Sequence, residues 1–195
     1  MKVRRMRMAM VAAIVMLCLG LAACATAPMT PSKKAEQQDE VRNMAQTALA
    51  QLYEKNPAAQ DAVTNAAGYA VFSDFGFKLL FMGGSKGEGI AVNNANKQET
   101  FMKMAEFQPG LGVGASKFRV VFVFDNPAAF NSFVTSGWEA GANAMAAAKS
   151  KTAGGALRGA VTLSEGVYMY QMTETGLIVG VSITAAKYYK DDDLN

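Results

Sequence analysis

The chain has 195 residues, 51% of them hydrophobic and 18% charged, with 19 Lys and Arg against 16 Asp and Glu, two cysteines and no histidine. It is too apolar for a disordered protein, and two cysteines cannot form a disulfide-rich scaffold. The lack of histidine excludes mechanisms that use an imidazole base or an imidazole metal ligand. The length suits one domain with a hydrophobic core.

The first residues have the composition of a secretory signal. Residues 1–8 contain four basic side chains and no acidic one, and residues 9–23 follow without any charge. A positively charged segment followed by an apolar segment of this length is the pattern of a signal peptide. We therefore predict that residues 1–23 are a signal peptide.

The end of the apolar run resembles the lipobox of bacterial lipoproteins. Residues 21–24 read Leu-Ala-Ala-Cys. The resemblance implies cleavage before Cys24, a diacylglyceryl group on its sulfur, and acylation of the new amino group, for example by palmitate. Cleavage after an Ala-Thr-Ala sequence at residues 25–27 is an alternative, but Pro28 would then follow the cut and disfavours it. A second alternative is that the apolar segment is retained as a membrane anchor. However, a membrane-spanning helix needs roughly 20 apolar residues, and Gly20 and Pro28 interrupt the segment.

Processing changes the charge of the protein. Loss of residues 1–23 removes four basic and no acidic residues, which leaves 15 basic against 16 acidic side chains and a net charge of −1. A nucleic-acid-binding surface is therefore not expected. With Cys18 removed and Cys24 lipidated, no free thiol or disulfide remains. Residues 24–35 are predicted to be the lipidated cysteine and a tether. By analogy with such lipoproteins, Ala25 after the cysteine favours an outer-membrane anchor that faces the periplasm.

The clearest predicted helix covers residues 36–55. Its polar face begins acidic, whereas helices that lie on a membrane surface favour Lys and Arg, so we favour packing of its apolar stripe on the domain. The sequence Asn56-Pro57 ends this helix, and a shorter helix is expected over residues 57–67. The apolar residues that recur at helical spacing are Val41, Met44, Ala45, Ala48, Leu49, Leu52 and Tyr53.

From Gly68 onward the pattern changes to that of strands. Segments rich in aliphatic and aromatic residues alternate with glycine, asparagine and proline, which are typical of turns. Turns are expected at residues 94–96 and 108–110. The expected strands cover residues 68–73, 75–84, 87–93, 99–107, 111–115 and 118–124.

The region after the strands begins with a third helix. Asn126 is a good N-cap and Pro127 suits the first helical position, so a helix is predicted to start there. An alanine-rich helix is expected over residues 138–149, followed by a flexible break over residues 150–155.

The end of the chain is predicted to be a hairpin. Its strands cover residues 167–172 and 177–189 with a turn at residues 173–176, and the acidic residues 191–193 are interpreted as a solvated tail. Together the elements predict one α+β domain over residues 36–195. Its sheet of seven or eight strands is mainly antiparallel and curled toward a barrel, with an N-terminal helix and a helix after the central strands.

The sequence offers no complete catalytic or metal-binding motif. The glycine-rich segments 83–89 and 110–114 match neither G-x-x-x-x-G-K-[ST] nor G-x-G-x-x-G, and turn or bulge glycines in a curved sheet explain them. We therefore predict that the protein is not an enzyme and needs no cofactor and no metal. Carboxylates could pair across the sheet, but nothing in the sequence selects two among Asp74, Glu88, Glu99, Glu106, Asp125, Glu139, Glu165 and Glu174.

Basic and aromatic residues are mixed in the strand-rich region. A basic rim around an apolar surface would suit an anionic lipid headgroup and its chains. The alternative is ordinary alternation, with Phe in the core and Lys toward solvent. The candidate lipid-binding residues are Lys78, Lys86, Lys103, Lys117 and Arg119.

Several short segments follow one another in an order typical of a known family. They are residues 66–72 (AAGYAVF), 83–84 (GG), 87–89 (GEG), 110–114 (GLGVG), 118–125, 133–141 (FVTSGWEAG) and 175–180 (TGLIVG). Together they resemble the SYLF domain in its bacterial lipoprotein form, over residues 37–195. The order of the segments carries the resemblance, since no single segment is decisive.

The resemblance implies lipid binding. Eukaryotic members bind phosphoinositide-containing membranes, some through an N-terminal amphipathic helix, and some bind actin, which does not fit a periplasm. The matching helix here has only Arg42 and Lys55 as basic residues, and residues 100–109 replace a Trp-Ser-x-Pro segment of the eukaryotic members, so neither phosphoinositide specificity nor the contacts of that segment are expected. We expect a membrane-anchored envelope lipoprotein that binds phospholipid or another amphiphile. The alternative is a non-catalytic envelope scaffold that docks another envelope component.

Overall fold

The computed structural model describes residues 29–140, 157–173, 176–178 and 185–195, and only the backbone of residues 77–82, 108–116, 140 and 176–178. The chain divides into two compact units, Met1–Lys33 and Lys34–Asn195. The sheet and the cores described below belong to the second unit.

Two helices precede the sheet, as predicted. Helix α2 covers Pro31–Lys55 and helix α3 covers Ala58–Asn65. The helix α2 begins earlier than expected, at Pro31 rather than at residue 36. Pro31 favours this start, because a proline in the first helical turn costs no backbone hydrogen bond. The apolar stripe of α2 is buried at Val41, Ala45, Ala48 and Leu52.

Two long strands form most of the sheet. Strand β1 covers Gly68–Asn93 and strand β2 covers Glu99–Phe124, and they pair antiparallel from Gly68 opposite Phe124 to Val92 opposite Glu99. The predicted turn after Asn93 is confirmed. The breaks expected within each strand, including the turn at residues 108–110, are wrong, because the two strands bend together instead of ending. The register shifts between Leu80 and Met82, where Met82 lies opposite Pro109. Such an irregularity tolerates a residue that has no N–H to donate.

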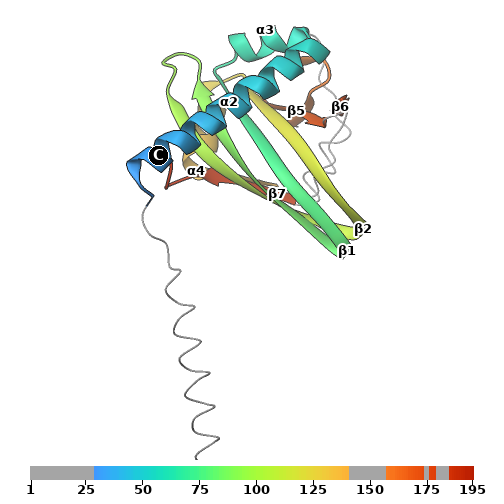
Figure 1. Ribbon diagram of the computed structural model, residues 1–195. Helices are drawn as coiled ribbons and strands as arrows, with labels where there is room; N and C mark the ends of the chain where they lie inside the picture. Colours follow the sequence, from blue (N-terminus) through green and yellow to red (C-terminus); the bar gives the residue numbers. More distant parts are fainter. Residues whose placement is uncertain (1–28, 141–156, 174–175, 179–184) are drawn as a thin grey trace, which may run out of the picture. The chain divides into compact units, whose positions relative to one another are not determined.

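Strand β2 is the centre of the antiparallel sheet (Figure 1). One of its edges pairs with β1. Its other edge pairs with β7 (Ala185–Lys190) along Met102–Phe107 and with β5 (Val167–Thr173) along Phe118–Phe124. Three short strands complete the described sheet, namely β3 (Trp138–Ala140) beside β7, and β4 (Val161–Ser164) and β6 (Gly176–Ile178) beside β5. The predicted α+β class with a curled antiparallel sheet is therefore confirmed.

The helix after the central strands begins where the sequence indicated. Helix α4 covers Pro127–Ser136, and the side chain of Asn126 accepts a hydrogen bond of 2.8 Å from the backbone N–H of Ala129. The helix ends at Gly137, whose φ is +72°, a conformation that favours glycine.

Two predictions for the C-terminal region need correction. Residues 138–140 form strand β3 rather than the start of a helix, since Trp138 pairs with Tyr188 and packs against its ring at 5.8 Å. The rest of the predicted alanine-rich helix and the flexible break lie outside the described residues. The hairpin pairing of β5 with β6 is confirmed, but residues 185–190 of the predicted second arm pair with β2 and β3 rather than with β5.

The bend brings two parts of β1 into close contact. Figure 1 shows β1 and β2 running together to one end of the sheet and turning back there. A Cβ added at Gly87 would lie 2.5 Å from the backbone oxygen of Ser73 and 2.9 Å from the Cα of Asp74. Gly89 faces Phe72 and Val71 in the same way. Glycine is therefore required where the returning half of β1 meets the first half.

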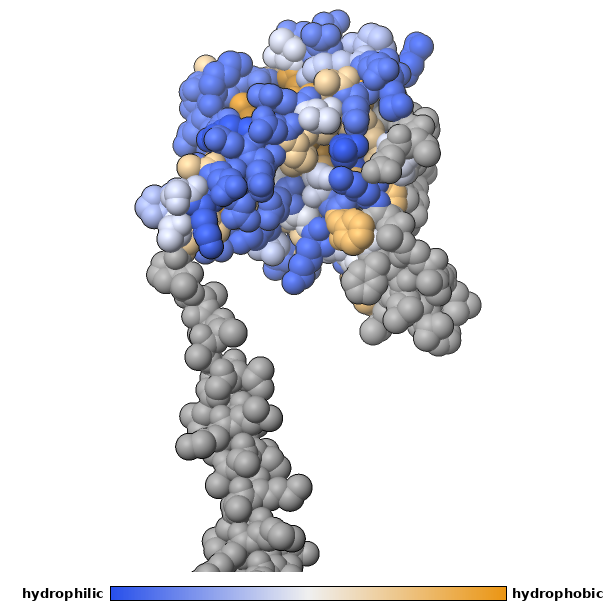
Figure 2. Space-filling model, in the orientation of Figure 1, coloured by the Kyte–Doolittle hydropathy of each residue, from blue (hydrophilic) through white to orange (hydrophobic). Residues whose placement is uncertain are grey.

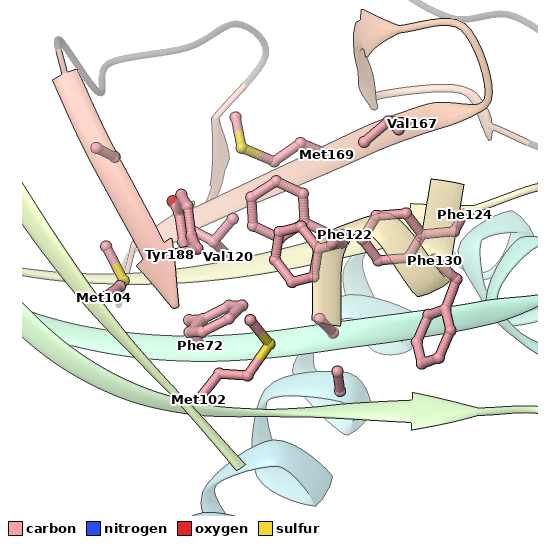
Figure 3. Packing of buried hydrophobic residues seen from close by; sticks show 14 of the residues in the cluster. Phe72, Met102, Met104, Val120, Phe122, Phe124, Phe130, Val167, Met169 and Tyr188 are labelled. Carbon is pink, nitrogen blue, oxygen red and sulfur yellow. The ribbon is translucent and has the colours of Figure 1, made fainter. Parts of the chain in front are cut away.

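The two faces of the sheet carry separate hydrophobic cores. Successive residues of a strand point to opposite faces, so Phe72, Phe122 and Phe124 contribute to one core and Val71, Val121 and Val123 to the other. The first core is aromatic and includes α4. The ring centroids of Phe72 and Phe122 lie 4.8 and 4.9 Å from that of Tyr188, and Figure 3 shows these side chains in the cluster. The second core receives the apolar stripe of α2.

The contact at Gly87 gives a first prediction. Gly87→Ala should destabilise the fold by about 1–3 kcal/mol, because the added methyl group meets backbone atoms that cannot rotate away. The free energy of unfolding in urea measures this effect. Gly84→Ala is the control, since its Cβ would meet only the oxygen of Glu106 at 3.1 Å. Equal stability of the Gly87→Ala protein and the original protein would show that the halves of β1 do not meet as described.

Candidate functional site

A cavity of about 470 Å³ opens between α2, both halves of β1, β2 and β7. It exists because β1 turns back on itself, so that residues 73–75 and 86–88 border the same space. We call this cavity the groove. Its lining residues are Glu40, Val41, Met44, Ser73, Asp74, Phe75, Lys86, Gly87, Glu88, Lys103, Met104, Lys117 and Tyr189.

The groove brings together three of the five predicted lipid-binding residues. Lys86, Lys103 and Lys117 line it, although they are far apart in the sequence. Lys78 lies opposite Gly114 in the bend, and its side chain is outside the described residues. Arg119 is not a lining residue: its Nη1 donates a 2.8 Å hydrogen bond to Gln51 of α2, and its buried Nε has no partner within the described residues.

Two exposed aromatic side chains border the same groove. The side chains of Phe75 and Tyr189 are 62% and 38% exposed. Phe75 belongs to the mixed basic and aromatic region that the sequence indicated. Tyr189 was missed, because only the non-local pairing of β7 with β2 brings it opposite Lys103. The groove thus combines cationic groups with apolar surface.

Lys103 is held by the C-terminal acidic residues. Its Nζ lies 2.7 Å from Asp191 and 3.0 Å from Asp193. Partial burial opposes protonation, but the hydrogen bonds to Asp191 and Asp193 raise the pKa of Lys103 above its ordinary value. The predicted solvated tail is therefore wrong for Asp191, which is buried, whereas Asp192 and Asp193 are exposed.

The last residue, Asn195, is held by hydrogen bonds between its side-chain amide and the backbone of Phe101 in β2. The side-chain amide of Asn195 donates to the oxygen of Phe101 (2.7 Å) and accepts from its N–H (3.1 Å). Leu194 is buried against the α2 core, and Gln38 donates to its backbone oxygen at 2.7 Å. These contacts explain why Asp191 is drawn out of solvent, and composition alone could not indicate them.

Asp74 is a buried carboxyl group in the wall of the groove. Its side chain is 2% exposed; Oδ1 accepts a 3.1 Å hydrogen bond from the N–H of Phe118, and Oδ2 has no hydrogen-bond partner among the described residues. Burial raises the pKa of Asp74, and interactions with Ser85, the Phe118 N–H and Glu106 offset this only in part. A native Asp74 is therefore harder to ionise than an unfolded one.

Further polar groups lie buried around Asp74. Ser85 Oγ donates to Glu106 Oε2 at 3.2 Å, and both residues are buried. The hydroxyl of Tyr188 is buried and has no hydrogen-bond partner in the part of the chain that the structure describes. Burial, followed by the charges of Glu106 and Asp74, raises the pKa of Tyr188 well above its ordinary value. Of the eight carboxylates that the sequence left open, the fold thus brings Asp74 and Glu106 together.

No helix in the described part of the chain is long and apolar enough to cross a membrane. Within that part, no group of three or more His, Cys, Asp or Glu side chains is arranged to hold a metal ion.

The raised pKa of Asp74 gives a second prediction. The native state retains a proton on this carboxyl to higher pH than the unfolded state, so stability falls as the pH rises from the ordinary carboxyl pKa through the raised native value. Asp74→Asn removes the cost of ionising a buried carboxyl group. The asparagine keeps an oxygen that can accept from the Phe118 N–H, and its NH₂ group can donate to Ser85 and Glu106. It should raise Tm at pH 7 by about 2–4 °C, which corresponds to about 1 kcal/mol.

Thermal unfolding between pH 4 and 8 measures this change. Asp192→Asn is the matched control, because Asp192 is exposed. A lower Tm for Asp74→Asn at pH 7 would contradict the prediction and would mean that the ionised carboxylate stabilises the fold.

Comparisons with known proteins agree with the geometry. A model of the Ysc84 family, described as Las17-binding protein actin regulator, matches residues 105–195. Beta cell expansion factor A of Aeromonas veronii is 32% identical over 166 residues, which are 85% of this chain and 62% of that relative. The chain thus spans less than two thirds of the length of this relative. Such relationships support a binding or interaction role. By the order of its motifs, its fold and these two matches, the chain belongs to the Ysc84/SYLF family.

Proposed function

We propose that the protein is a membrane-anchored envelope lipoprotein whose SYLF domain binds phospholipid or another amphiphile. The observation that carries this proposal is the convergence of Lys86, Lys103 and Lys117 with Phe75 and Tyr189 on one groove. Apolar pockets with a few polar groups are typical of sites for small amphiphilic ligands.

The lysines of the groove differ in their availability. Lys103 already pairs with Asp191 and Asp193. Within the described residues, Lys86 and Lys117 are exposed and form no ion pair. These two side chains are free to receive an anionic headgroup, and Phe75 and Tyr189 offer apolar surface to the chains attached to it.

The anchor is the second part of the proposal. Cys24 carries the lipid and tethers the domain to a membrane. One acyl chain binds a membrane only marginally, whereas two or more give stable attachment. We place the protein at the outer membrane on its periplasmic side, because Ala25 rather than Asp follows the cysteine.

Mass spectrometry of the mature protein tests the anchor. We expect a chain that begins at Cys24 and carries the added mass of a diacylglyceryl group and an amide-linked acyl chain. A free thiol at Cys24, or a chain that still contains Met1, would overturn the processing that we propose.

Vesicle binding tests the lipid-binding function. The mature chain with Cys24→Ser lacks the anchor and keeps the whole compact unit Lys34–Asn195. It should sediment with vesicles that contain phosphatidylglycerol at low salt. The double variant Lys86→Glu/Lys117→Glu should bind about 30-fold more weakly, because each lysine near an anionic surface contributes about 1 kcal/mol.

The matched control for this experiment is Lys97→Glu, an exposed lysine in the turn at the other end of the β1–β2 hairpin. Its binding should change little. If the anchor-free chain stays in solution at low salt, the domain has no intrinsic affinity for lipid and the proposal is wrong.

A second candidate is a scaffold that docks another envelope component and performs no catalysis. It is favoured by the description of the family model as that of a protein-binding regulator. A second cavity of about 800 Å³, with mostly polar lining that includes Arg42, Glu99 and Asn131, is a surface where a protein could dock. Photo-crosslinking in cells from these positions would yield discrete protein adducts for a scaffold, and lipid adducts near the groove for the first proposal.

A further inference from the structure

The two most exposed large hydrophobic side chains of the described residues lie on the long hairpin. Phe75 is 62% exposed and Phe107 is 51% exposed. Phe75 stands where the first half of β1 enters the bend, and Phe107 stands opposite Gly84, where the bend ends. These two residues therefore border the bend of the hairpin from both sides.

Both phenylalanines lie on the face of the sheet that α2 covers elsewhere. Alternate residues of a strand share one face, so Phe75 is on the side of Val71, and Phe107 is on the side of Phe101. Val71 and Phe101 both pack in the α2 core. Figure 1 shows β1 and β2 continuing beyond α2 toward the bend, so that α2 does not cover this part of the face. Figure 2 shows that the described surface in this view is mostly hydrophilic, with isolated hydrophobic residues.

The sequence of the bend is apolar. Residues 75–84 read FGFKLLFMGG and residues 108–116 read QPGLGVGAS, with Lys78 as the one charged residue. The backbone register places Phe77 opposite Ala115 and Leu79 opposite Val113. An apolar double strand thus lies between Phe75 and Phe107.

Basic residues flank this apolar segment. Lys117 lies directly opposite Phe75, and Lys86 is two residues from Gly84, the partner of Phe107. Residues 75–87 and 107–118 contain three lysines and no acidic residue, although the mature chain as a whole has a net charge of −1. Apolar and aromatic side chains bordered by lysines fit the boundary between the headgroups and the acyl chains of an anionic bilayer.

We propose that the bend of the β1–β2 hairpin inserts into the interfacial layer of an anionic phospholipid membrane, with Phe75 and Phe107 below the headgroups and Lys86 and Lys117 at the phosphates. This inference rests on the proposed lipid-binding function and identifies the element that enters the membrane. The occupant of this surface is a bilayer rather than a protein, because the positive charge and the apolar residues are combined at one projecting end.

The strand pairing limits the depth of insertion. At the bend β1 and β2 pair with each other, and among the described residues β7 pairs with Met102–Phe107 and β5 with Phe118–Phe124. Backbone groups on the outer edges that no described strand pairs need other hydrogen-bond partners. Such groups are costly in hydrocarbon but are satisfied among headgroups and water, so the bend enters the interface and does not span the bilayer.

Site-specific labelling tests this geometry. The mature chain with Cys24→Ser contains no cysteine, so single cysteines at Phe75, at Phe107 and, as control, at Asn96 can carry an environment-sensitive nitrobenzoxadiazole group. Asn96 is exposed at the opposite end of the same hairpin. With phosphatidylglycerol vesicles, the labels at positions 75 and 107 should brighten and should be quenched by nitroxide lipids labelled near the headgroup. The label at position 96 should remain unchanged.

A second measurement removes the phenylalanines. Phe75→Ser/Phe107→Ser should weaken vesicle binding by at least about 10-fold, since burial of one such side chain contributes about 1.5–3 kcal/mol. Thermal unfolding should be unchanged because both side chains are exposed. If the chain binds vesicles while the labels at positions 75 and 107 stay in water, the proposed insertion of the bend is wrong, but the proposed lipid-binding function is not contradicted. If the chain does not bind vesicles at all, both the lipid-binding function and the insertion of the bend are wrong.

Discussion

The close approach of the two halves of β1 is the constraint on which the rest of the structure depends. Gly87 and Gly89 leave no room for a Cβ against Ser73, Phe72 and Val71, so the returning half can lie directly on the first. This contact lets two strands of 26 residues each form a curled sheet with two separately packed faces. It also creates the groove, because residues 73–75 and 86–88 are brought to the same place.

The same bend explains why buried polar groups gather beside a hydrophobic core. Asp74, Ser85 and Glu106 come from three positions near the ends of the bend, and the hydroxyl of Tyr188 joins them from β7. Burial of such groups costs stability unless each is paired. Asp74 and Tyr188 are incompletely paired in the described structure. This region therefore is less optimised for stability than the aromatic core around Phe72 and Phe122, and it lies next to the groove that we propose as the functional site.

Local signals in the sequence predicted local structure well and long-range structure less well. The apolar stripe of α2 and the cap at Asn126 were predicted because each depends on residues within a few turns. The continuity of β2 through Pro109 was not predicted, since proline usually ends a strand. Strand β3 was mistaken for a helix, because its pairing partner, Tyr188, is distant in the sequence.

The sequence by itself determined the family, the α+β class and the type of residues available for binding, because these follow from composition, spacing and motif order. Only the tertiary structure decided which lysines meet. Lys86, Lys103 and Lys117 share the groove, whereas Arg119 binds Gln51 of α2. It also decided that Asp191 is buried beside Lys103. The physical reason is that these positions are brought together by the bend of the hairpin and by non-local strand pairing, which no local pattern in the sequence encodes.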